Sequence, residues 1–170
     1  MTTDSVSDRQ RESFDHLAGK YLTFELGEET YGVGIIKVQE IIKMQEITKV
    51  PRTPDYVEGV INLRGKVMPV ISLRKIFGME EAVTSRDTCI IVMQVSRGET
   101  PVILGVIVDK VSEVQEISAE EIEPAPSFGT QINTQFILGM AKTKDTVTIL
   151  LDMDKIVSEE EMASLAQTSG

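Results

Sequence analysis

Apolar and polar residues alternate along several short segments of this chain, which is the pattern of β-strands with one buried face. The first such segment is 20–26, and the turn residues Gly27-Glu28-Glu29 lead into a second strand expected at 30–36. The apolar spacing in 38–44 fits a short helix as well as an extended segment with bulges. The pattern leaves those two alternatives open.

The clearest element is a β-hairpin at 57–72, where two β-branched runs flank the polar tip Asn62-Leu63-Arg64-Gly65-Lys66. Gly65 is expected to have a positive φ, because it has no Cβ to clash. Arg64 is expected to project from the tip, where its planar guanidinium suits a carboxylate or carbonyl partner. Pro69 lacks an N–H, so we expect it at an edge or a bulge.

The same pattern occurs twice, which predicts an internal duplication. Tyr56-Val57-Glu58-Gly59 aligns with Phe136-Ile137-Leu138-Gly139 at an offset of 80 residues. Lys37-Val38-Gln39-Glu40-Ile41 aligns with Lys110-Val111-Ser112-Glu113-Val114 at an offset of 73 residues. The extra residues of the second copy are expected in 124–130, which carries Gly, Pro and Ser.

Many short strands separated by turn signals predict a mainly β fold of small barrels. A short helix is expected at 73–77, capped by Ser72. Residues 1–18 are polar and aperiodic and are expected to form a flexible arm. A capping box at Ser158 predicts a C-terminal helix in 159–170, with Met162 and Leu165 on its apolar side.

Charge and cysteine content narrow the classes of partner and compartment. The net charge of −10 argues against binding to nucleic acid or to an anionic membrane surface. A single cysteine, Cys89, excludes an intramolecular disulfide, fits a reducing compartment and is expected to be a small buried hydrophobe. No signal segment or membrane-length apolar run is present, so we expect a cytoplasmic protein without direct membrane insertion.

Catalytic constellations are missing from the sequence. The only histidine, His16, lies in the expected arm, so a nucleophile would have no rigid base. No phosphate-binding loop occurs, and Asp152 with Asp154 supply only two carboxylates, which favours helix capping over metal binding. We therefore expect neither an enzyme nor a cofactor or metal site. An active site without a known motif is the alternative.

The duplication provides an internal control on function. The tip sequence Asn62-Leu63-Arg64-Gly65 occurs in one copy only, because its counterpart is Lys142-Thr143-Lys144-Asp145. A hairpin of this kind therefore does not need these residues to fold, which favours a recognition role for them. Glu40 is a weaker candidate, because its twin Glu113 is also explained by a role in the fold.

Six segments of the chain match the pattern of a known family. They are Tyr31-Gly32-Val33, Lys37-Val38-Gln39-Glu40-Ile41, Gly59-Val60-Ile61-Asn62-Leu63-Arg64-Gly65, Pro69-Val70-Ile71-Ser72-Leu73-Arg74, Gly105 to Val114 and Ile149-Leu150-Leu151-Asp152. Together they resemble the CheW family. The resemblance covers about 19–158 in order, with Ser72 where an Asp is common and Met68 before the proline as slight departures.

This resemblance implies two intertwined five-stranded SH3-like barrels, the first at about 19–80 and the second at about 87–157, within a CheW-like domain at 19–158. It implies no catalysis and no cofactor. CheW-like proteins are chemotaxis adaptors that join the histidine kinase CheA, through its regulatory domain, to the cytoplasmic tips of methyl-accepting chemoreceptors. Carried over by position, the receptor-binding residues are Val38, Glu40, Gly59, Asn62 and Arg64. For the kinase, the candidates are exposed apolar positions around the hairpins.

The chain contains no kinase, phosphotransfer or receiver segment, so we expect the stand-alone adaptor. The alternative is an SH3-like peptide-binding scaffold of another two-component or motility pathway. An aromatic content of 5% without tryptophan gives no obvious polyproline groove.

Overall fold

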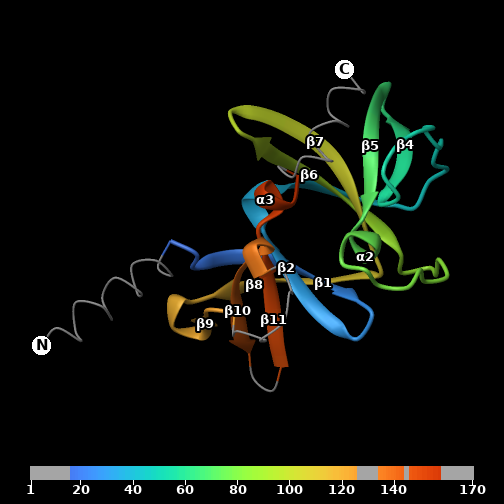
Figure 1. Cartoon of the computed structure of the whole chain (residues 1–170). Coiled ribbons are helices and arrows are strands. Elements are labelled where there is room, and N and C mark those ends of the chain that lie inside the picture. Colours follow the sequence, from blue (N-terminus) through green and yellow to red (C-terminus); the bar gives the residue numbers. More distant parts are fainter. Residues whose placement is uncertain (1–15, 126–133, 144–145, 158–170) are drawn as a thin grey trace, which may run out of the picture.

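The computed structural model describes residues 16–125, 134–143 and 146–157, which form a mainly β structure of two sheets (Figure 1). The expected helix at 159–170 and most of the expected arm at 1–18 lie outside these ranges. In the first sequence copy the elements are β1 (Gly19–Leu26), β2 (Glu29–Gly34), the 3-10 turn η1 (Ile35–Lys37), β3 (Val38–Lys43), β4 (Val57–Leu63), β5 (Lys66–Ser72) and α2 (Leu73–Ile76).

The second copy repeats the order of the five main strands and the helix, without a 3-10 turn between its second and third strands and with additional short elements before its hairpin. Its elements are β6 (Cys89–Arg97), β7 (Thr100–Val108), β8 (Lys110–Ile117), the 3-10 turn η2 (Ala119–Glu121), β9 (Ile122–Glu123), the 3-10 turn η3 (Thr134–Phe136), β10 (Ile137–Thr143), β11 (Thr146–Leu151) and α3 (Met153–Val157).

The two copies exchange hairpins, which confirms the intertwined fold. The six-stranded sheet has the order β8-β1-β2-β11-β10-β9, and the five-stranded sheet has the order β3-β6-β7-β5-β4. The β1–β2 hairpin thus completes the sheet of the second copy, and β6–β7 completes that of the first. The expected barrel boundaries, 19–80 and 87–157, follow the two sequence copies, whereas each sheet takes strands from both copies.

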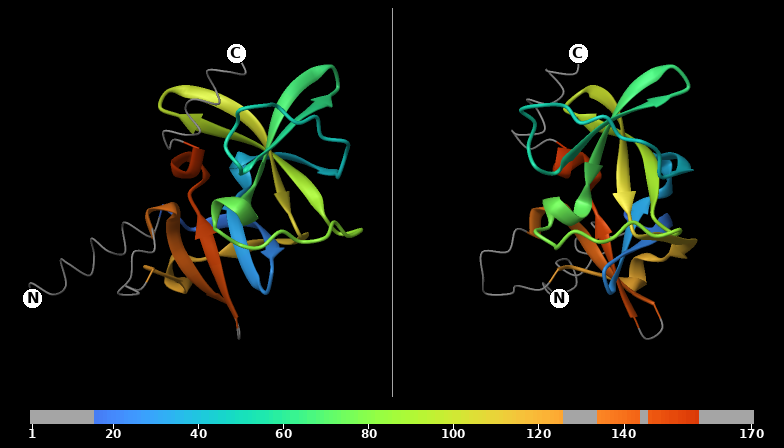
Figure 2. Two further views of the ribbon diagram at one scale, coloured as in Figure 1. Left: turned by 45° about the vertical axis from the view of Figure 1, so that its right-hand side comes forward. Right: turned by 90° about the vertical axis from the view of Figure 1, so that its right-hand side faces the viewer.

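Two parallel strand pairs make these junctions, and they occupy equivalent positions. In the six-stranded sheet β2 pairs with β11, and Gly32 lies opposite Leu150. In the five-stranded sheet β7 pairs with β5, and Gly105 lies opposite Val70. Figures 1 and 2 show the two sheets on opposite sides of a layer that contains α2 and α3. The duplication therefore gives the domain an approximate two-fold symmetry.

Three apolar clusters form the core. The largest lies between the sheets and joins both copies, for example Phe24 of β1 and Met93 of β6, which are fully buried. A smaller cluster around Tyr21 and Leu150 lies in the six-stranded sheet, and one around Val70 and Ile90 lies in the five-stranded sheet. Because the central cluster takes side chains from both copies, neither half can fill its core alone.

Two charged clasps fasten the helices to the exchanged hairpins. Arg74 of α2 binds Asp109 through two hydrogen bonds, one of them 2.8 Å from Nε to Oδ1, and the Gly27 N–H donates to the same carboxylate. In the equivalent place Asp154 of α3 accepts from Lys37 Nζ at 2.6 Å and from the Ser96 N–H at 2.8 Å. The helix residue in the ion pair is positive in α2 and negative in α3. In both copies this ion pair connects the helix to the hairpin that the other copy contributes.

The structure resolves the local alternatives. Residues 38–43 are an extended strand with a register shift between Val38 and Glu40, so the helix alternative is wrong and the bulged one is right. The Ser72 hydroxyl caps α2 by accepting the Lys75 N–H, as predicted.

Pro69 lies in β5, which is not an edge strand. It is tolerated because β5 pairs with β7 only from Val70 onward.

We predict that valine at Gly105 destabilises the protein more than valine at Gly32. A Cβ at Gly105 would lie 2.6 Å from Ile90 Cγ2, whereas one at Gly32 would lie 3.1 Å from Leu150 Cδ2. Overpacking of this kind costs about 1–3 kcal/mol, and the Gly105→Val loss should be at the upper end. Urea denaturation measures both losses.

Each variant should still unfold in a single transition, because the central cluster and both sheets contain strands from the two copies. Calorimetry of Gly105→Val tests this expectation. Two separate transitions, one for each sequence half, would contradict the shared core.

We predict a pH-dependent effect of Asp109→Asn. The Arg74 guanidinium lowers the pKa of the Asp109 carboxyl, so the carboxylate stabilises the fold above its ordinary pKa of about 4, and this contribution is lost as the pH falls below that value. Asp109→Asn should lower the unfolding free energy at pH 7 by about 1–3 kcal/mol. The difference from the parent protein should shrink toward pH 2. Asp55→Asn is the control, since Asp55 is 93% exposed and should show little change at either pH.

Candidate partner-binding site

A two-residue turn shapes the tip of the β4–β5 hairpin. Arg64 and Gly65 both have positive φ angles, 51° and 85°, as in a type I′ turn. The flanking residues Leu63 and Lys66 are cross-strand partners. The Asn62 side-chain oxygen accepts the Gly65 N–H at 2.8 Å, so Asn62 stabilises the turn. The predicted positive φ of Gly65 is confirmed. Arg64 shares this conformation, which is uncommon for a residue with a Cβ.

Arg64 forms an ion pair with Glu40, which brings two of the sequence-predicted site residues together. Nη1 donates to Oε1 at 3.0 Å, and Nη2 donates to Oε2. Glu40 lies in β3, at one edge of the five-stranded sheet, while the hairpin carrying Arg64 forms the opposite edge. The ion pair therefore connects the two edges and closes the curled sheet at this end.

The ion pair keeps both groups charged and leaves part of the guanidinium available. Hydrogen bonding to Arg64 lowers the pKa of the Glu40 carboxyl, and the same bonds raise the pKa of Arg64. The Arg64 side chain is 69% exposed and that of Glu40 is 30% exposed. A guanidinium has five N–H donors, so Arg64 can bind Glu40 and still donate to an acidic or carbonyl group of a partner.

The other two predicted residues play different parts. Val38 is partly buried against the central apolar cluster at the start of β3. Gly59 is buried in β4 with φ +142°, and a Cβ there would lie 2.1 Å from the Thr48 carbonyl oxygen. The Thr48 N–H and C=O pair with Val60 at 2.9 Å each. Gly59 is therefore required for a close backbone approach next to the site.

In the second copy the described counterparts of Glu40 and Asn62 have other partners. Glu113, the twin of Glu40, is exposed and accepts from the Gln115 side chain instead. Lys142, at the position of Asn62, binds Glu123 of β9 at 2.6 Å. The tip residues 144–145 lie outside the described ranges. Glu113 and Lys142 therefore bind differently from Glu40 and Asn62, and the sequence has Lys144 at the position of Arg64.

Two apolar residues near Glu40 were not predicted from the sequence. Ile36 of η1 is 90% exposed, and Ile41 of β3 is 45% exposed. Strand alternation could not identify them, because Ile36 lies in a 3-10 turn before β3 and the pattern in 38–44 left a helix and a strand as alternatives. Together with the partly buried Val38 they place apolar surface on the elements that adjoin the ion pair.

The remaining candidates for chemistry show no catalytic arrangement. Cys89 is partly buried against the central cluster, and this burial raises the pKa of its thiol. Asp152 caps the start of α3 by accepting the Lys155 N–H, as predicted, and Asp154 belongs to the clasp with Lys37. In the ranges that the structure describes, no group of three or more His, Cys, Asp or Glu side chains is placed to hold a metal ion.

Comparison with known proteins identifies the family. The profile of the CheW-like domain matches residues 20–161. The chain belongs to the CheW family. It is 38% identical over 144 residues to the chemotaxis protein CheW of Klebsiella aerogenes, covering 85% of this chain and 84% of that one. It is 36% identical to the CheW of Treponema pallidum, covering 85% of both chains.

A solved CheW structure agrees with the fold. The scaffolding protein TtCheW from Thermoanaerobacter tengcongensis superposes with a TM-score of 0.74 at 40% identity, covering 85% of this chain and 95% of that one. The protein is accordingly a non-catalytic chemotaxis adaptor, and its two β-sheets are those of a CheW scaffold. No helix within the described residues is long and apolar enough to span a membrane.

We predict that Gly59→Ala destabilises this CheW protein by about 2–4 kcal/mol, because it combines a positive φ with a clash against the Thr48 backbone. Gly65→Ala is the matched control. It also has a positive φ but nothing within 4 Å of its Cβ position, so about 1–2 kcal/mol is expected. Urea titration measures both variants. A fully stable Gly59→Ala protein would contradict the requirement for a close backbone approach at this position.

Proposed function

We propose that the protein works in the cytoplasm and couples the tips of methyl-accepting chemoreceptors to the regulatory domain of the histidine kinase CheA. Membership of the CheW family supports this general role. The observation that carries the receptor part is the Arg64–Glu40 ion pair at the exposed tip of the first copy, whose tip sequence the second copy does not share. A feature that the duplicated fold does not need is best explained by a partner.

The receptor surface in this proposal contains Val38, Glu40, Asn62 and Arg64. Glu40 orients the guanidinium, and Asn62 fixes the turn from which it projects. The exposed residues Ile36 and Ile41 add apolar area to this surface. Gly59 contributes indirectly, because its missing side chain lets the backbone of Thr48 lie against β4.

Arg64→Glu tests the receptor part. The side chain is largely exposed, so stability should change by only about 0.5 kcal/mol. Affinity for a receptor-tip fragment should fall by about 2–5 kcal/mol, because a charge-assisted contact is lost and Glu40 faces a like charge. Calorimetric titration measures the affinity, and thermal denaturation measures the stability.

Two further variants help to interpret the effect of Arg64→Glu on receptor affinity. Lys144→Glu changes the corresponding tip of the second copy, outside the described residues, and should leave receptor affinity nearly intact. The charge swap Arg64→Glu with Glu40→Arg restores the ion pair but not the direct contact, so affinity should stay low. Recovery by the swap would mean that the pair only closes the sheet. Equal losses at both tips would overturn the asymmetry argument.

The proposed kinase contact uses the hairpins of the two sheets. Val67 in β5 and Val147 in β11 are equivalent positions, and they are 72% and 46% exposed. Since neither contributes to the core, their apolar side chains suit contact with another barrel. Val67→Asp and Val147→Asp should each leave the unfolding free energy within about 0.5 kcal/mol. At least one should weaken binding to the CheA regulatory domain tenfold or more, as measured by titration. Full affinity in both variants would exclude these hairpins.

A further inference from the structure

The ion pair between Lys37 and Asp154 holds a turn that adjoins the proposed receptor surface. Lys37 is the last residue of η1, between Ile36 and Val38. None of the three residues of η1 is buried, and no described side chain caps the start of this turn. Packing alone therefore holds η1 less firmly than a buried segment. The Lys37 side chain adds a charged connection, through its 2.6 Å bond to Asp154.

The two clasps of the domain differ by one residue, and this difference leaves Ile36 exposed. Arg74 and Asp154 are equivalent positions, because they lie 80 residues apart. Arg74 binds Asp109, whose equivalent at an offset of 73 residues is Ile36. Asp154 instead binds Lys37, the next residue, so Ile36 takes no part in the clasp and is 90% exposed. The clasp of α3 therefore leaves this isoleucine available to a partner.

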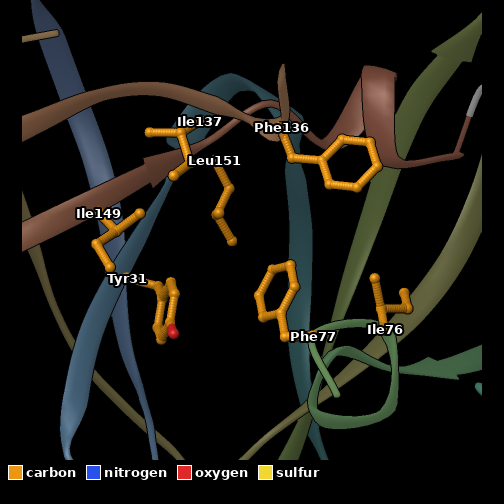
Figure 3. Close-up of a pocket in the computed structure, with 7 residues that line it drawn as sticks. All are labelled: Tyr31, Ile76, Phe77, Phe136, Ile137, Ile149 and Leu151. Carbon is orange, nitrogen blue, oxygen red and sulfur yellow. The ribbon is translucent and has the colours of Figure 1, made fainter. Parts of the chain in front are cut away.

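The helix that carries Asp154 is firmly packed. Its residues Ile156 and Val157 are 1% and 4% exposed. Their equivalents in α2, Ile76 and Phe77, are only partly buried and line an apolar pocket of about 380 Å³ between α2 and the six-stranded sheet (Figure 3). α3 therefore gives its clasp a firmer support than α2 does.

Asp154 also connects this helix to β6. Its Oδ1 accepts the Ser96 N–H at 2.8 Å, while its Oδ2 accepts from Lys37 Nζ. β6 pairs with β3, the strand that follows η1, and Glu40 lies opposite Val92 in this pairing. One carboxylate therefore fixes η1 relative to the strand that supports Glu40.

We propose that Asp154 is a positioning residue for receptor binding. It holds η1 so that the Ile36 side chain packs against the receptor while Arg64 binds beside it. This inference rests on the receptor surface proposed above. It extends that proposal, because it assigns part of the receptor affinity to a helix of the other sequence copy.

A double-mutant cycle in the full chain tests this role. Ile36→Ala, Asp154→Asn and their combination are titrated calorimetrically with a soluble fragment of a chemoreceptor tip. Each single variant should weaken binding about fivefold or more, because apolar contact at Ile36 is lost or misplaced. The combined variant should match Ile36→Ala within about twofold, because η1 then presents no side chain to misplace. Full affinity of Ile36→Ala, or a combined loss equal to the product of the single losses, would overturn the proposal.

Asp109→Asn is the matched control, because it breaks the equivalent clasp of α2. Neither Asp109 nor its described partners Arg74 and Gly27 belong to the proposed receptor surface. At a temperature where circular dichroism shows every variant to be folded, its receptor affinity should stay within about twofold of the parent protein. Lys37→Arg keeps the charge-assisted bond and should also bind within about twofold of the parent. A loss in Asp109→Asn as large as that in Asp154→Asn would overturn the positioning role.

Arg64→Glu in the same titration separates this inference from the proposed function. A loss in Arg64→Glu with full affinity in Asp154→Asn would overturn the positioning role alone. Full affinity in both variants would overturn the proposed receptor surface as well.

Discussion

Strand pairing between the two sequence copies is the constraint on which the structure depends. Each copy alone would leave the edges of β2 and β5 without partners, and unpaired strand edges are poorly tolerated. The parallel pairs β2–β11 and β7–β5 satisfy both edges at once. Gly105 lies in β7 and lets this strand pack against Ile90 and Met68, where a Cβ would clash. The central core then forms between the sheets, with side chains from both copies.

Duplication gives the fold two copies of its five main strands and of the helix that follows them, and the sequences of the two copies differ at their hairpin tips. In the first copy the β4–β5 hairpin reaches across to β3 through Arg64 and Glu40. In the second, Lys142 binds the added strand β9 instead. Both solutions stabilise a hairpin, but only the first leaves a partly free guanidinium on an exposed turn. Divergence at the tips can therefore create a binding surface without altering the shared core.

The two charged clasps show the same principle inside the domain. Arg74 with Asp109 and Lys37 with Asp154 hold equivalent helices against exchanged hairpins, although the charge on the helix is positive in one copy and negative in the other. The geometry of the fold sets where a charge-assisted bond is needed, and either sign satisfies it as long as the partner is complementary. The helices themselves pack differently. α3 is buried on its sheet, while α2 leaves the apolar pocket open.

The sequence by itself determined the duplication, the hairpins, the Ser72 cap and the positive φ of Gly65, because these depend on residue spacing and local backbone preference. It also singled out Arg64, because the corresponding tip of the second copy has a different sequence. Tertiary structure decided the rest. Alternation predicted a half-buried first strand, yet Tyr21 through Phe24 are all buried, since β1 contributes to the core of its own sheet and to the central core. The pairing of Arg64 with Glu40, the Gly59–Thr48 contact and the hairpin exchange join residues that are distant in the chain. Local patterns carry no information on which distant edges meet, because that choice depends on the packing of both copies together.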